Sequence, residues 1–462
     1  MDPLPINEVA RHERFLASTR RHVLIIKSDG IHQWQITPGL PDTGGQNVFV
    51  NQFSQALANL GFRITIANRG GYPHPQTGEL HRGLRYKDDH QRILYLEDGL
   101  AEFVRKEEMG PRITALVLNL RDHLTREGST LDFIFSHYWD GARIGMLLNR
   151  ELPRAVPHIW VPYSLGTIKQ HQVRAEEQLH LHLEERINLE QSIIREVNGV
   201  AAPSTAIRHA LQHDYNYVTS LFLPPCVDTA RFHPREIAPT DPIWRFLSDH
   251  AGLPPERVRE CRIVTEISRT DTTKRKDVLI RAFARAHKLV PACLLVISID
   301  DSEQPLAGQL RRLIDSLGIR RHTAIVGTVA SQLPYIYAVS SIYCTPSILE
   351  GFGTSVQEAA AAGVPAIASD RVPFAVEYLL SRDYEERELG GSADPVRLGA
   401  GAIVVKSDDV DGFAGALELL LGDDELRKKM GDRAHRITLP YFTWERTVKL
   451  FLNRAGIEPG AH

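Results

Sequence analysis

The sequence predicts an α/β protein built from two doubly wound parallel sheets. At 462 residues the chain is too long for one ordinary hydrophobic core and suits two domains of about 200 residues each. In each half, short apolar runs of strand length alternate with segments whose apolar residues recur at helical spacing. Each half also has a glycine turn between a strand and the next helix. We therefore expect domains at 1–233 and 234–440, with the final segment 441–462 crossing back onto the first.

The first half begins with the apolar run 22–26, which predicts a buried strand. Phe49, Phe53 and Leu57 then recur at helical spacing, and Gly61 ends that helix. The same alternation continues along this half. We expect further strands at 63–67, 91–96, 131–135, 158–161 and 199–202, and helices at 113–124, 142–149 and 178–196.

The second half follows 234–259, a segment of prolines and mixed charge that we interpret as a linker with one short helix. A helix near its end is expected to begin near Ser355 and to stop at Gly363, with Pro365 beyond it. Strands and helices again alternate before that point, which indicates a parallel sheet. The expected strands are 263–267, 293–299, 323–326 and 341–345, and the expected helices are 278–287, 306–317 and 333–338.

Composition excludes several classes of protein. A net charge of −3 provides no basic field for nucleic acid. The four cysteines are scattered without a C-x-x-C pair, which favours buried thiols in a reducing compartment. Charged residues within 1–20 argue against a signal peptide, and no apolar run is long enough to span a membrane. We expect a cytoplasmic protein without a membrane segment.

The stretch 346–365 contains the strongest functional signal, because two carboxylates flank a glycine turn at a helix start. Gly351 and Gly353 allow main-chain N–H groups to face a ligand, and Thr354 or Ser355 can cap the helix. The helix N-terminus favours a diphosphate. Glu350 in the loop and Glu358 one turn into the helix can accept hydroxyls of a sugar and of a ribose. The alternative is an ordinary strand, turn and helix with two solvated glutamates.

A second glycine turn precedes the first helix, where Gly44 and Gly45 allow a substrate close to the backbone and Gln46 can bind it. The alternative is a tight turn without a ligand. His137 and Tyr163 follow predicted strands and, with Ser164 and Lys169, should share one crevice at the strand ends. His137 is equally compatible with a structural role.

A basic loop follows the first strand of the second half. Arg269, Lys274, Arg275 and Lys276 would face the crevice between the domains and could neutralise a diphosphate leaving group. The alternative is a solvated basic loop. Asp409-Val-Asp411 matches the D-x-D pattern of metal-dependent transferases, but it lies in an acidic surface turn, so we expect no metal there.

Four motifs stand in one order along the chain: Asp42-Thr-Gly-Gly-Gln46, Ser164-Leu-Gly-x-x-Lys169, Arg269-x-Asp-x-x-Lys274 and Glu350-x-Phe-Gly to Glu358. This arrangement resembles the retaining GT-B glycosyltransferases that include sucrose-phosphate synthase, sucrose synthase and mannosylfructose-phosphate synthase. The resemblance implies a GT-B fold of two Rossmann-like domains with an active-site cleft between them. The first domain would bind the acceptor and the second the nucleotide-sugar donor.

The resemblance also implies a role for individual residues. The catalytic residues would be Glu350, Arg269 and Lys274. The donor would be bound by Glu358, Gly351, Phe352, Gly353, Thr354, Ser355, His137 and Tyr163. The acceptor would be bound by Gly44, Gly45, Gln46, Lys106, Lys169 and Arg186. Neither a metal nor another cofactor is implied.

The implied reaction is retaining transfer of a hexose, with glucose favoured, from UDP- or ADP-glucose to a small sugar, sugar phosphate or polyol. Two departures concern the donor and acceptor sites: Tyr163 stands where relatives carry histidine, and Glu185-Arg186 stands where sucrose-phosphate synthases carry two arginines. A glutamate there would repel a phosphate, so an uncharged acceptor has comparable weight. The alternatives are a GT-B nucleotide-sugar epimerase and a catalytically silent sugar-nucleotide sensor. The sequence does not predict an oligomeric state.

Overall fold

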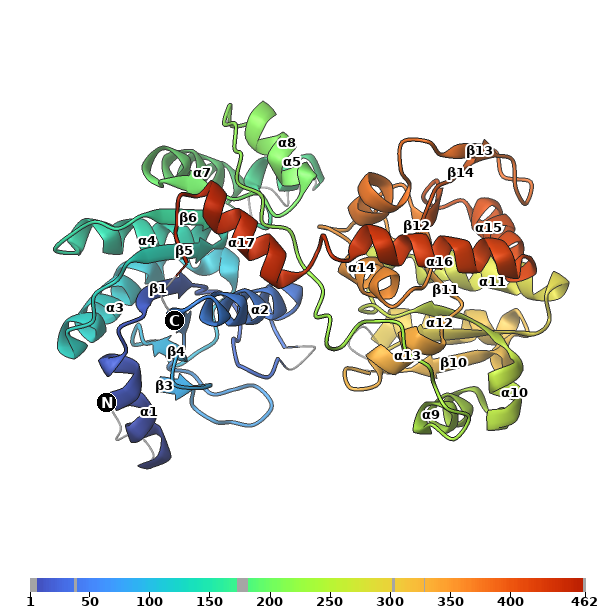
Figure 1. Cartoon of the computed structure of the whole chain (residues 1–462), viewed down its shortest axis with the longest axis horizontal. Coiled ribbons are helices and arrows are strands. Elements are labelled where there is room, and N and C mark those ends of the chain that lie inside the picture. The colour runs from blue at the N-terminus through green and yellow to red at the C-terminus, as the bar shows by residue number, and fades with distance from the viewer. Residues whose placement is uncertain (1–5, 37–39, 173–181, 301–303, 328, 460–462) are drawn as a thin grey trace. The chain divides into compact units, whose positions relative to one another are not determined.

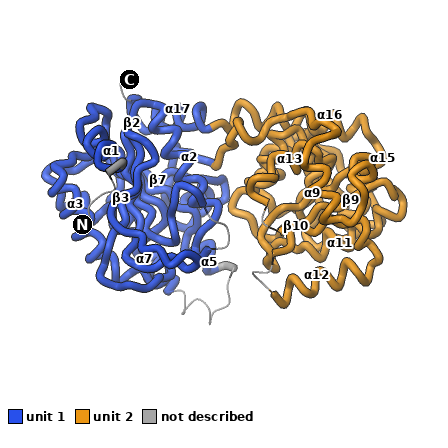
Figure 2. The backbone as a smooth tube through the Cα atoms, turned by 90° about the horizontal axis from the view of Figure 1, so that it is seen from below, with its two compact units in different colours: residues 1–224, 444–462 blue, residues 225–443 orange. Residues whose placement is uncertain are grey.

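The computed structural model describes residues 6–36, 40–172, 182–300, 304–327 and 329–459 (Figure 1). The chain forms two compact units, coloured separately in Figure 2. Unit 1 contains Met1–Pro224 and Trp444–His462, and unit 2 contains Pro225–Thr443. Each unit is an α/β domain around a largely parallel sheet, as the alternation of strands and helices predicts. The boundaries expected at 233/234 and 440/441 stay predictions.

The sheet of unit 1 has seven strands in the order β3-β4-β2-β1-β5-β6-β7. The edge pair β3–β4 is antiparallel, and the other described pairs are parallel. In the central register Val23 of β1 lies opposite Ile64 of β2 and Phe133 of β5. The strands are β1 Arg21–Ile26, β2 Phe62–Arg69, β3 Gly83–Tyr86, β4 Gln91–Leu96, β5 Phe133–His137, β6 His158–Val161 and β7 Gly199–Val200.

Helices cover both faces of this sheet. Val23 and Ile25 of β1 join the core under α2 and α17, whereas Leu24 and Ile26 join the core under α3 and α4, because successive strand residues point to opposite faces. Figure 1 shows α17 beside α2. The helices are α1 Ile6–Ala17, α2 Gly45–Asn59, α3 Ile113–Glu127, α4 Tyr138–Glu151, α5 Gly166–Gln172, α7 Leu183–Glu196, α8 Thr205–His213 and α17 Trp444–Arg454, with short 3-10 turns η1 Lys106–Glu108 and η2 Gly110–Arg112.

The sheet of unit 2 has eight strands in the order β10-β9-β8-β11-β12-β15-β14-β13. The pairs β13–β14 and β14–β15 are antiparallel, and the other described pairs are parallel. The strands are β8 Arg262–Glu266, β9 Cys293–Ser298, β10 Thr323–Val326, β11 Ile342–Thr345, β12 Ala366–Ser369, β13 Glu385–Arg387, β14 Val396–Leu398 and β15 Ala402–Val405.

The order of strands reverses at β8, which lies between β9 and β11. Ligands bind at such switch points in open parallel sheets, so the loops after β8 and β11 are the expected place for a site. The helices are α9 Pro242–Ala251, α10 Pro255–Glu260, α11 Lys276–Leu289, α12 Gln304–Ser316, α13 Leu333–Val339, α14 Thr354–Ala361, α15 Val410–Gly422 and α16 Asp424–Thr438, with the short turns η3 Thr272–Lys274, η5 Arg320–His322 and η6 Ala375–Leu379.

Three local expectations differ from the structure. The segment 234–259 carries two helices, α9 and α10, because Asp241 caps one and Pro255 begins the other. Helix α4 begins at Tyr138, immediately after β5, instead of at 142. The strand expected over 199–202 is shorter, because Ala202 bridges to Phe222 outside the sheet. The part of the helix expected at 178–181 lies outside the described residues.

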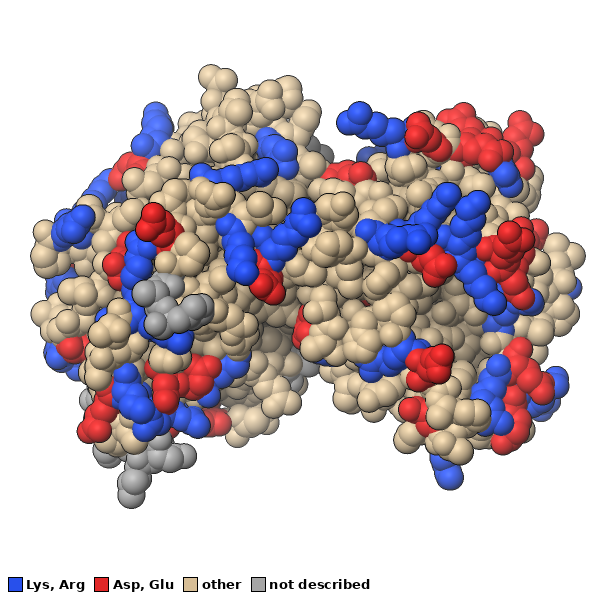
Figure 3. Space-filling model, viewed as in Figure 1, with Lys and Arg blue, Asp and Glu red and all other residues tan. Residues whose placement is uncertain are grey.

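Charged side chains of both signs are interspersed on the face of the molecule shown in Figure 3. This mixture agrees with the small net charge of −3. In the part of the chain that the structure describes, none of the helices combines the length and apolar character that a membrane crossing requires.

Candidate functional site

The loops after β8 and β11 of unit 2 bring Lys274 and Glu350 together. The Lys274 ammonium donates to Glu350 Oε1 at 2.6 Å, although 76 positions separate the two residues. The backbone holds the loops together as well, since Ile348 N–H donates to Thr273 O at 2.8 Å. The two side chains are 10% and 16% exposed, so the ion pair is shielded but open to a ligand. The cation predicted to stabilise the leaving group and the carboxylate predicted to bind the sugar therefore form one ion pair.

Arg269 behaves differently from Lys274. Its side chain is 82% exposed, and it pairs with Asp271 Oδ2 at 3.6 Å. Asp271 also caps η3 by accepting the N–H of Thr273. Arg269 is thus an exposed cation beside the site, whereas Lys274 is held in place.

The other two cations of the basic loop do not face a ligand, which corrects the expectation that all four do. Lys276 is buried, and its ammonium donates to Glu266 Oε2 at 2.7 Å and to Ser298 O at 2.6 Å. Arg275 pairs with Asp277 and Asp408. Lys276 neutralises a buried carboxylate at the end of β8, which is a structural role.

Gly353 makes the turn into α14 in a left-handed conformation, with φ 98°. A Cβ there would lie 2.7 Å from Val372 Cγ1, so the turn requires glycine. Gly353 itself is the N-cap, and the expected cap by Thr354 or Ser355 is wrong because both lie within the helix. Among the described residues no side chain caps α14, so its first N–H groups remain available to an anion.

Gly351 and Phe352 contribute to this turn in different ways. Gly351 is exposed, and a Cβ there would meet no described atom within 4 Å. The Phe352 ring is buried among Phe374, Tyr378 and Phe442, and its carbonyl accepts the N–H of Phe374 at 2.7 Å. Phe352 therefore anchors the glycine turn to the core.

Glu358 lies one turn into α14, as expected. Burial raises the pKa of its carboxyl to about 7, and the positive charge of Arg231 opposes that rise. The nearby Tyr337 hydroxyl also lowers the pKa of Glu358. Its oxygen, Tyr337 Oη, nevertheless has no hydrogen-bond partner of ordinary geometry within the described chain. The carboxylate form is thus short of donors, and two ribose hydroxyls would supply them.

In unit 1, the predicted glycine turn begins α2. A Cβ added at Gly44 or at Gly45 would meet no described atom within 4 Å, so the backbone there is accessible. Gln46 Nε2 is a buried amide nitrogen without a partner among the described residues. Asn47, which sequence reasoning missed, accepts the Gly44 N–H at 3.1 Å and donates to Ile31 O at 3.1 Å. Asn47 therefore ties the turn to the loop that follows β1.

Asn68 at the end of β2 was also missed. Its amide nitrogen donates to Lys27 O at 2.7 Å and lies 3.2 Å from Gly30 O. An asparagine that follows a strand was the only signal in the sequence. The Asn68 amide holds residues 27–30 of the loop that follows β1. Asn47 holds the later part of the same loop, at Ile31 and Gly44.

His137 and Tyr163 are brought into direct contact. His137 Nδ1 and Tyr163 Oη share a hydrogen bond of 2.8 Å, and the rings stack with centroids 5.6 Å apart. Burial lowers the pKa of His137 to about 3, with the charges of Lys27 and His32 adding to the effect. Burial raises the pKa of Tyr163, so both groups are neutral near pH 7. His137 Nε2 is buried without a partner in the described chain.

The predicted acceptor cations of unit 1 already have carboxylate partners. Lys106 Nζ donates to Asp42 Oδ1 at 2.6 Å, and Lys169 lies 3.5 Å from Glu107. Burial acts to raise the pKa of Asp42, but Lys106 holds that pKa below its ordinary value. Glu107 also lies 4.0 Å from Lys106, so it bridges the two lysines.

Arg186 is also satisfied by the fold. Its guanidinium donates to Glu190 at 2.8 Å, to Tyr138 Oη at 2.8 Å and to Ser164 O at 2.6 Å, and its side chain is 6% exposed. Glu185 points to solvent, with 86% of its side chain exposed. Arg186 therefore holds the Ser164 loop against α4 and α7.

The D-x-D motif has structural partners. Asp409 caps α15 by accepting the Gly412 N–H at 2.9 Å, and Asp411 pairs with Arg285. Across the described ranges, no three His, Cys, Asp or Glu side chains come together in an arrangement that could hold a metal ion.

Two family models match most of the chain. The model for Glycosyl transferases group 1 matches residues 256–437, and the model for Glycosyltransferase Family 4 matches residues 43–231. Among similar proteins, the mannosylfructose-phosphate synthase of Agrobacterium fabrum is 27% identical over 76% of this chain and 78% of its own length. The D-inositol 3-phosphate glycosyltransferase of Corynebacterium glutamicum is 27% identical over 89% of this chain and 91% of its own.

Solved structures show the same fold. Sucrose-phosphate synthase from Thermosynechococcus elongatus superimposes with a TM-score of 0.73 at 19% identity, covering 94% of this chain and 98% of that one. Anabaena Alr3699/HepE, solved in complex with UDP-glucose, has a TM-score of 0.63 at 15% identity and covers 94% and 99%.

Proposed function

The chain belongs to the group 1 glycosyltransferases of the GT-B fold, and on that premise we propose that it transfers a hexose from a nucleoside diphosphate to a small hydrophilic acceptor with retention of configuration. The observation that carries the proposal is the Lys274–Glu350 ion pair beside the uncapped N-terminus of α14, with Glu358 one turn along that helix. Unit 2 would bind the donor and unit 1 the acceptor.

The donor would be held by charge and by hydroxyl acceptors. The N–H groups at the start of α14 would bind the diphosphate, with Lys274 and Arg269 neutralising the charge that grows as it leaves. Glu358 would accept the ribose hydroxyls, and Glu350 would accept hydroxyls of the sugar. A charge-assisted hydrogen bond of this kind contributes about 1.5–3 kcal/mol. Glucose is the favoured sugar and UDP the favoured carrier, which the UDP-glucose complex of the HepE neighbour supports.

Retention would follow from attack on the same face as the leaving group. A bond forms between the acceptor hydroxyl oxygen and the anomeric carbon while the bond from that carbon to the diphosphate oxygen breaks, and the acceptor proton passes to the departing phosphate. Lys274 and Arg269 provide the positive charge that a metal supplies elsewhere, and Asp409 and Asp411 are engaged in a cap and an ion pair. We therefore propose a metal-independent reaction.

The acceptor would be an uncharged sugar or polyol. Lys106 and Lys169 are compensated by Asp42 and Glu107, so a phosphate would have to displace carboxylates. The relatives are named for mannosylfructose phosphate and D-inositol 3-phosphate, which makes a phosphorylated acceptor the alternative to test.

The test is release of nucleoside diphosphate from a panel of nucleotide hexoses, measured with and without neutral and phosphorylated acceptors, with the product anomer determined by NMR. The proposal expects acceptor-dependent release and a product that keeps the donor's configuration. Donor hydrolysis or epimerisation without an acceptor would assign a nucleotide-sugar epimerase. Donor binding with no turnover on any acceptor would assign a sugar-nucleotide sensor.

A further inference from the structure

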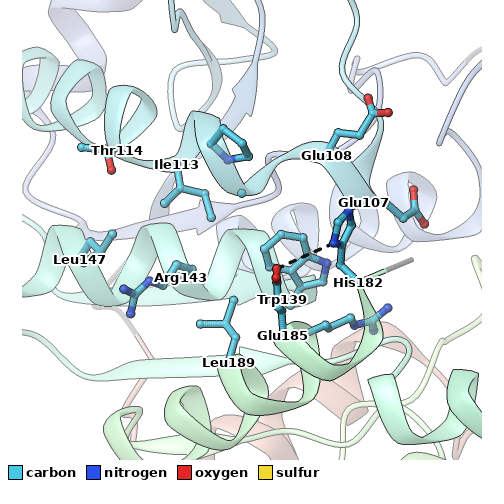
Figure 4. Close-up of a pocket in the computed structure, with 13 residues that line it drawn as sticks. Glu107, Glu108, Ile113, Thr114, Trp139, Arg143, Leu147, His182, Glu185 and Leu189 are labelled. Atoms are coloured by element: carbon cyan, nitrogen blue, oxygen red, sulfur yellow. Dashed lines mark ion pairs between the residues drawn. The ribbon is translucent and has the colours of Figure 1, made fainter. Parts of the chain in front are cut away.

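Unit 1 contains a cavity of about 550 Å³ beside the predicted acceptor residues (Figure 4). It lies among η1, η2, α3, α4 and α7. Its apolar lining comes from Ile113, Trp139, Leu147 and Leu189. Figure 4 shows Trp139 among these lining residues, between Ile113 and Glu185. The volume lies in the range of small-molecule sites, which are mainly apolar with a few placed polar groups.

Several polar groups of the cavity lack a partner. Trp139 is 8% exposed, and its indole N–H makes no hydrogen bond within the described ranges. The guanidinium of Arg143 and the carboxylate of Glu108 likewise have neither an ion pair nor a hydrogen bond there. Glu185 lies 4.0 Å from His182, and 86% of its side chain is exposed, so water solvates this carboxylate. An indole N–H without an acceptor in the described chain, on a side chain that is largely buried, can donate to a ligand in the cavity.

These groups match hydroxyls better than they match a charge. Trp139 and Arg143 donate, whereas Glu108 accepts, and a hydroxyl does both. The remaining charges of the lining are compensated, Glu107 by Lys169 at 3.5 Å and Arg186 by Glu190 at 2.8 Å. A phosphate would face the uncompensated carboxylate of Glu108, and a purely apolar ligand would leave donors and acceptors unpaired.

The cavity adjoins the predicted acceptor residues. Glu107 belongs to the lining and lies 4.0 Å from Lys106 and 3.5 Å from Lys169. Arg186 also lines the cavity while it holds the Ser164 carbonyl. A ligand group in the cavity can therefore belong to a molecule whose other end lies at these residues.

We propose that this cavity binds an uncharged sugar or cyclitol ring of the acceptor, one residue away from the ring that receives the hexose. The proposal rests on the proposed function, and it makes the acceptor a molecule of at least disaccharide size. Hydroxyls of the distal ring form hydrogen bonds with Trp139, Arg143 and Glu108. The apolar face of the ring packs on the apolar lining of the cavity.

The binding test uses the whole chain labelled with 5-fluorotryptophan and followed by fluorine NMR. Loss of one resonance in Trp139→Phe assigns Trp139, and Trp244, which belongs to unit 2, is the internal reference. The probes are sucrose, maltose and cellobiose, with glucose 6-phosphate and inorganic phosphate as charged comparisons. We expect at least one disaccharide to shift the Trp139 resonance saturably while Trp244 stays fixed.

Arg143→Gln and Glu108→Gln should each weaken that binding about tenfold or more, since each removes one charge-assisted hydrogen bond. Both side chains reach solvent, so these variants keep the test valid if Trp139→Phe folds poorly. No shift with any neutral disaccharide, or a stronger response to phosphate, would overturn the proposal. Protection of the chain by UDP-glucose against thermal unfolding is measured separately, so that loss of the subsite and loss of the transferase function give different results.

Discussion

Lys274 and Glu350 form an ion pair of 2.6 Å between the loops that follow β8 and β11. The residue expected to stabilise the leaving diphosphate thus also positions the carboxylate expected to bind the sugar. Variants at these two positions should therefore not act independently.

Glu350→Gln should lower kcat about 10- to 150-fold and leave nucleotide binding largely intact, because it keeps the size of the side chain but removes one charge-assisted contact of about 1.5–3 kcal/mol. The measurement is a double-mutant cycle of kcat/KM with Lys274→Ala, in which the combined loss should be smaller than the sum. Lys406→Ala is the matched control, since it breaks the exposed pair with Asp394. Unchanged turnover in Glu350→Gln would remove this residue from the site.

Arg269→Ala should slow transfer more than it weakens donor binding, since negative charge grows on the diphosphate only as the glycosidic bond breaks. Steady-state kinetics and nucleotide titration separate the two effects. Chelators should have little influence on the same assay. A requirement for added magnesium or manganese would contradict the proposed role of Lys274 and Arg269.

Glu358 should make donor binding depend on pH. Burial raises the pKa of its carboxyl to about 7. The population of the carboxylate, which is the form that accepts hydrogen bonds from ribose hydroxyls, therefore increases as the pH rises through that value. Donor affinity measured between pH 5.5 and 8.5, a range of about 1.5 units either side of that pKa, should therefore increase with pH. Glu358→Gln should bind more weakly at high pH and show a flat profile. An unchanged slope in the variant would assign the pH dependence to another group.

The same raised pKa predicts the effect on stability. The folded state binds the Glu358 proton more tightly than the unfolded chain, whose carboxyl has a pKa of 4.5. The contribution of this group to the free energy of unfolding should thus fall as the pH rises from about 4.5 to 7, by up to about 3 kcal/mol. Denaturant unfolding of the parent and of Glu358→Gln, followed from below pH 4.5 to pH 7, measures the pH-dependent difference, which should level off below pH 4.5.

Asp42→Asn should increase the use of fructose 6-phosphate relative to fructose, because it releases Lys106 from its carboxylate. We expect a gain in the ratio of kcat/KM values of roughly five- to thirtyfold, or about 1–2 kcal/mol. Glu185→Arg should gain less, because that side chain is 86% exposed and its charge is screened by water. If the parent enzyme already prefers fructose 6-phosphate strongly, the proposal of an uncharged acceptor is wrong and the acceptor is phosphorylated.

Tyr163→Phe should lower stability by about 1–3 kcal/mol, because it leaves buried His137 Nδ1 without its partner. Thermal unfolding of the whole chain measures the loss. Tyr217→Phe is a suitable control, since that tyrosine is partly exposed and its side chain makes no hydrogen bond in the described ranges. Equal unfolding temperatures in the parent and Tyr163→Phe would show that the hydrogen bond does not stabilise the fold.

Local sequence determined the elements and the position of the glycine turns. The alternation of Val23 and Ile25 with Leu24 and Ile26 predicts a strand buried on both faces, and the structure places helices on both. Gly351 and Gly353 predict a turn that leads directly into a helix, and α14 begins at Thr354. Such patterns are readable because the period of a strand or helix depends on neighbouring residues alone.

Tertiary structure decided which polar groups meet. Lys274 and Lys276 are two positions apart and chemically identical, yet one pairs with Glu350 in a loop and the other is buried against Glu266. Tyr163 reaches His137 because β5 and β6 are neighbours in the sheet. The partners of a charged side chain depend on strand order and on the loops that this order brings together, and those contacts join residues far apart in the chain. The sequence by itself therefore determined the fold class and the candidate motifs, whereas only the packed sheets decided which of their cations and carboxylates are already paired.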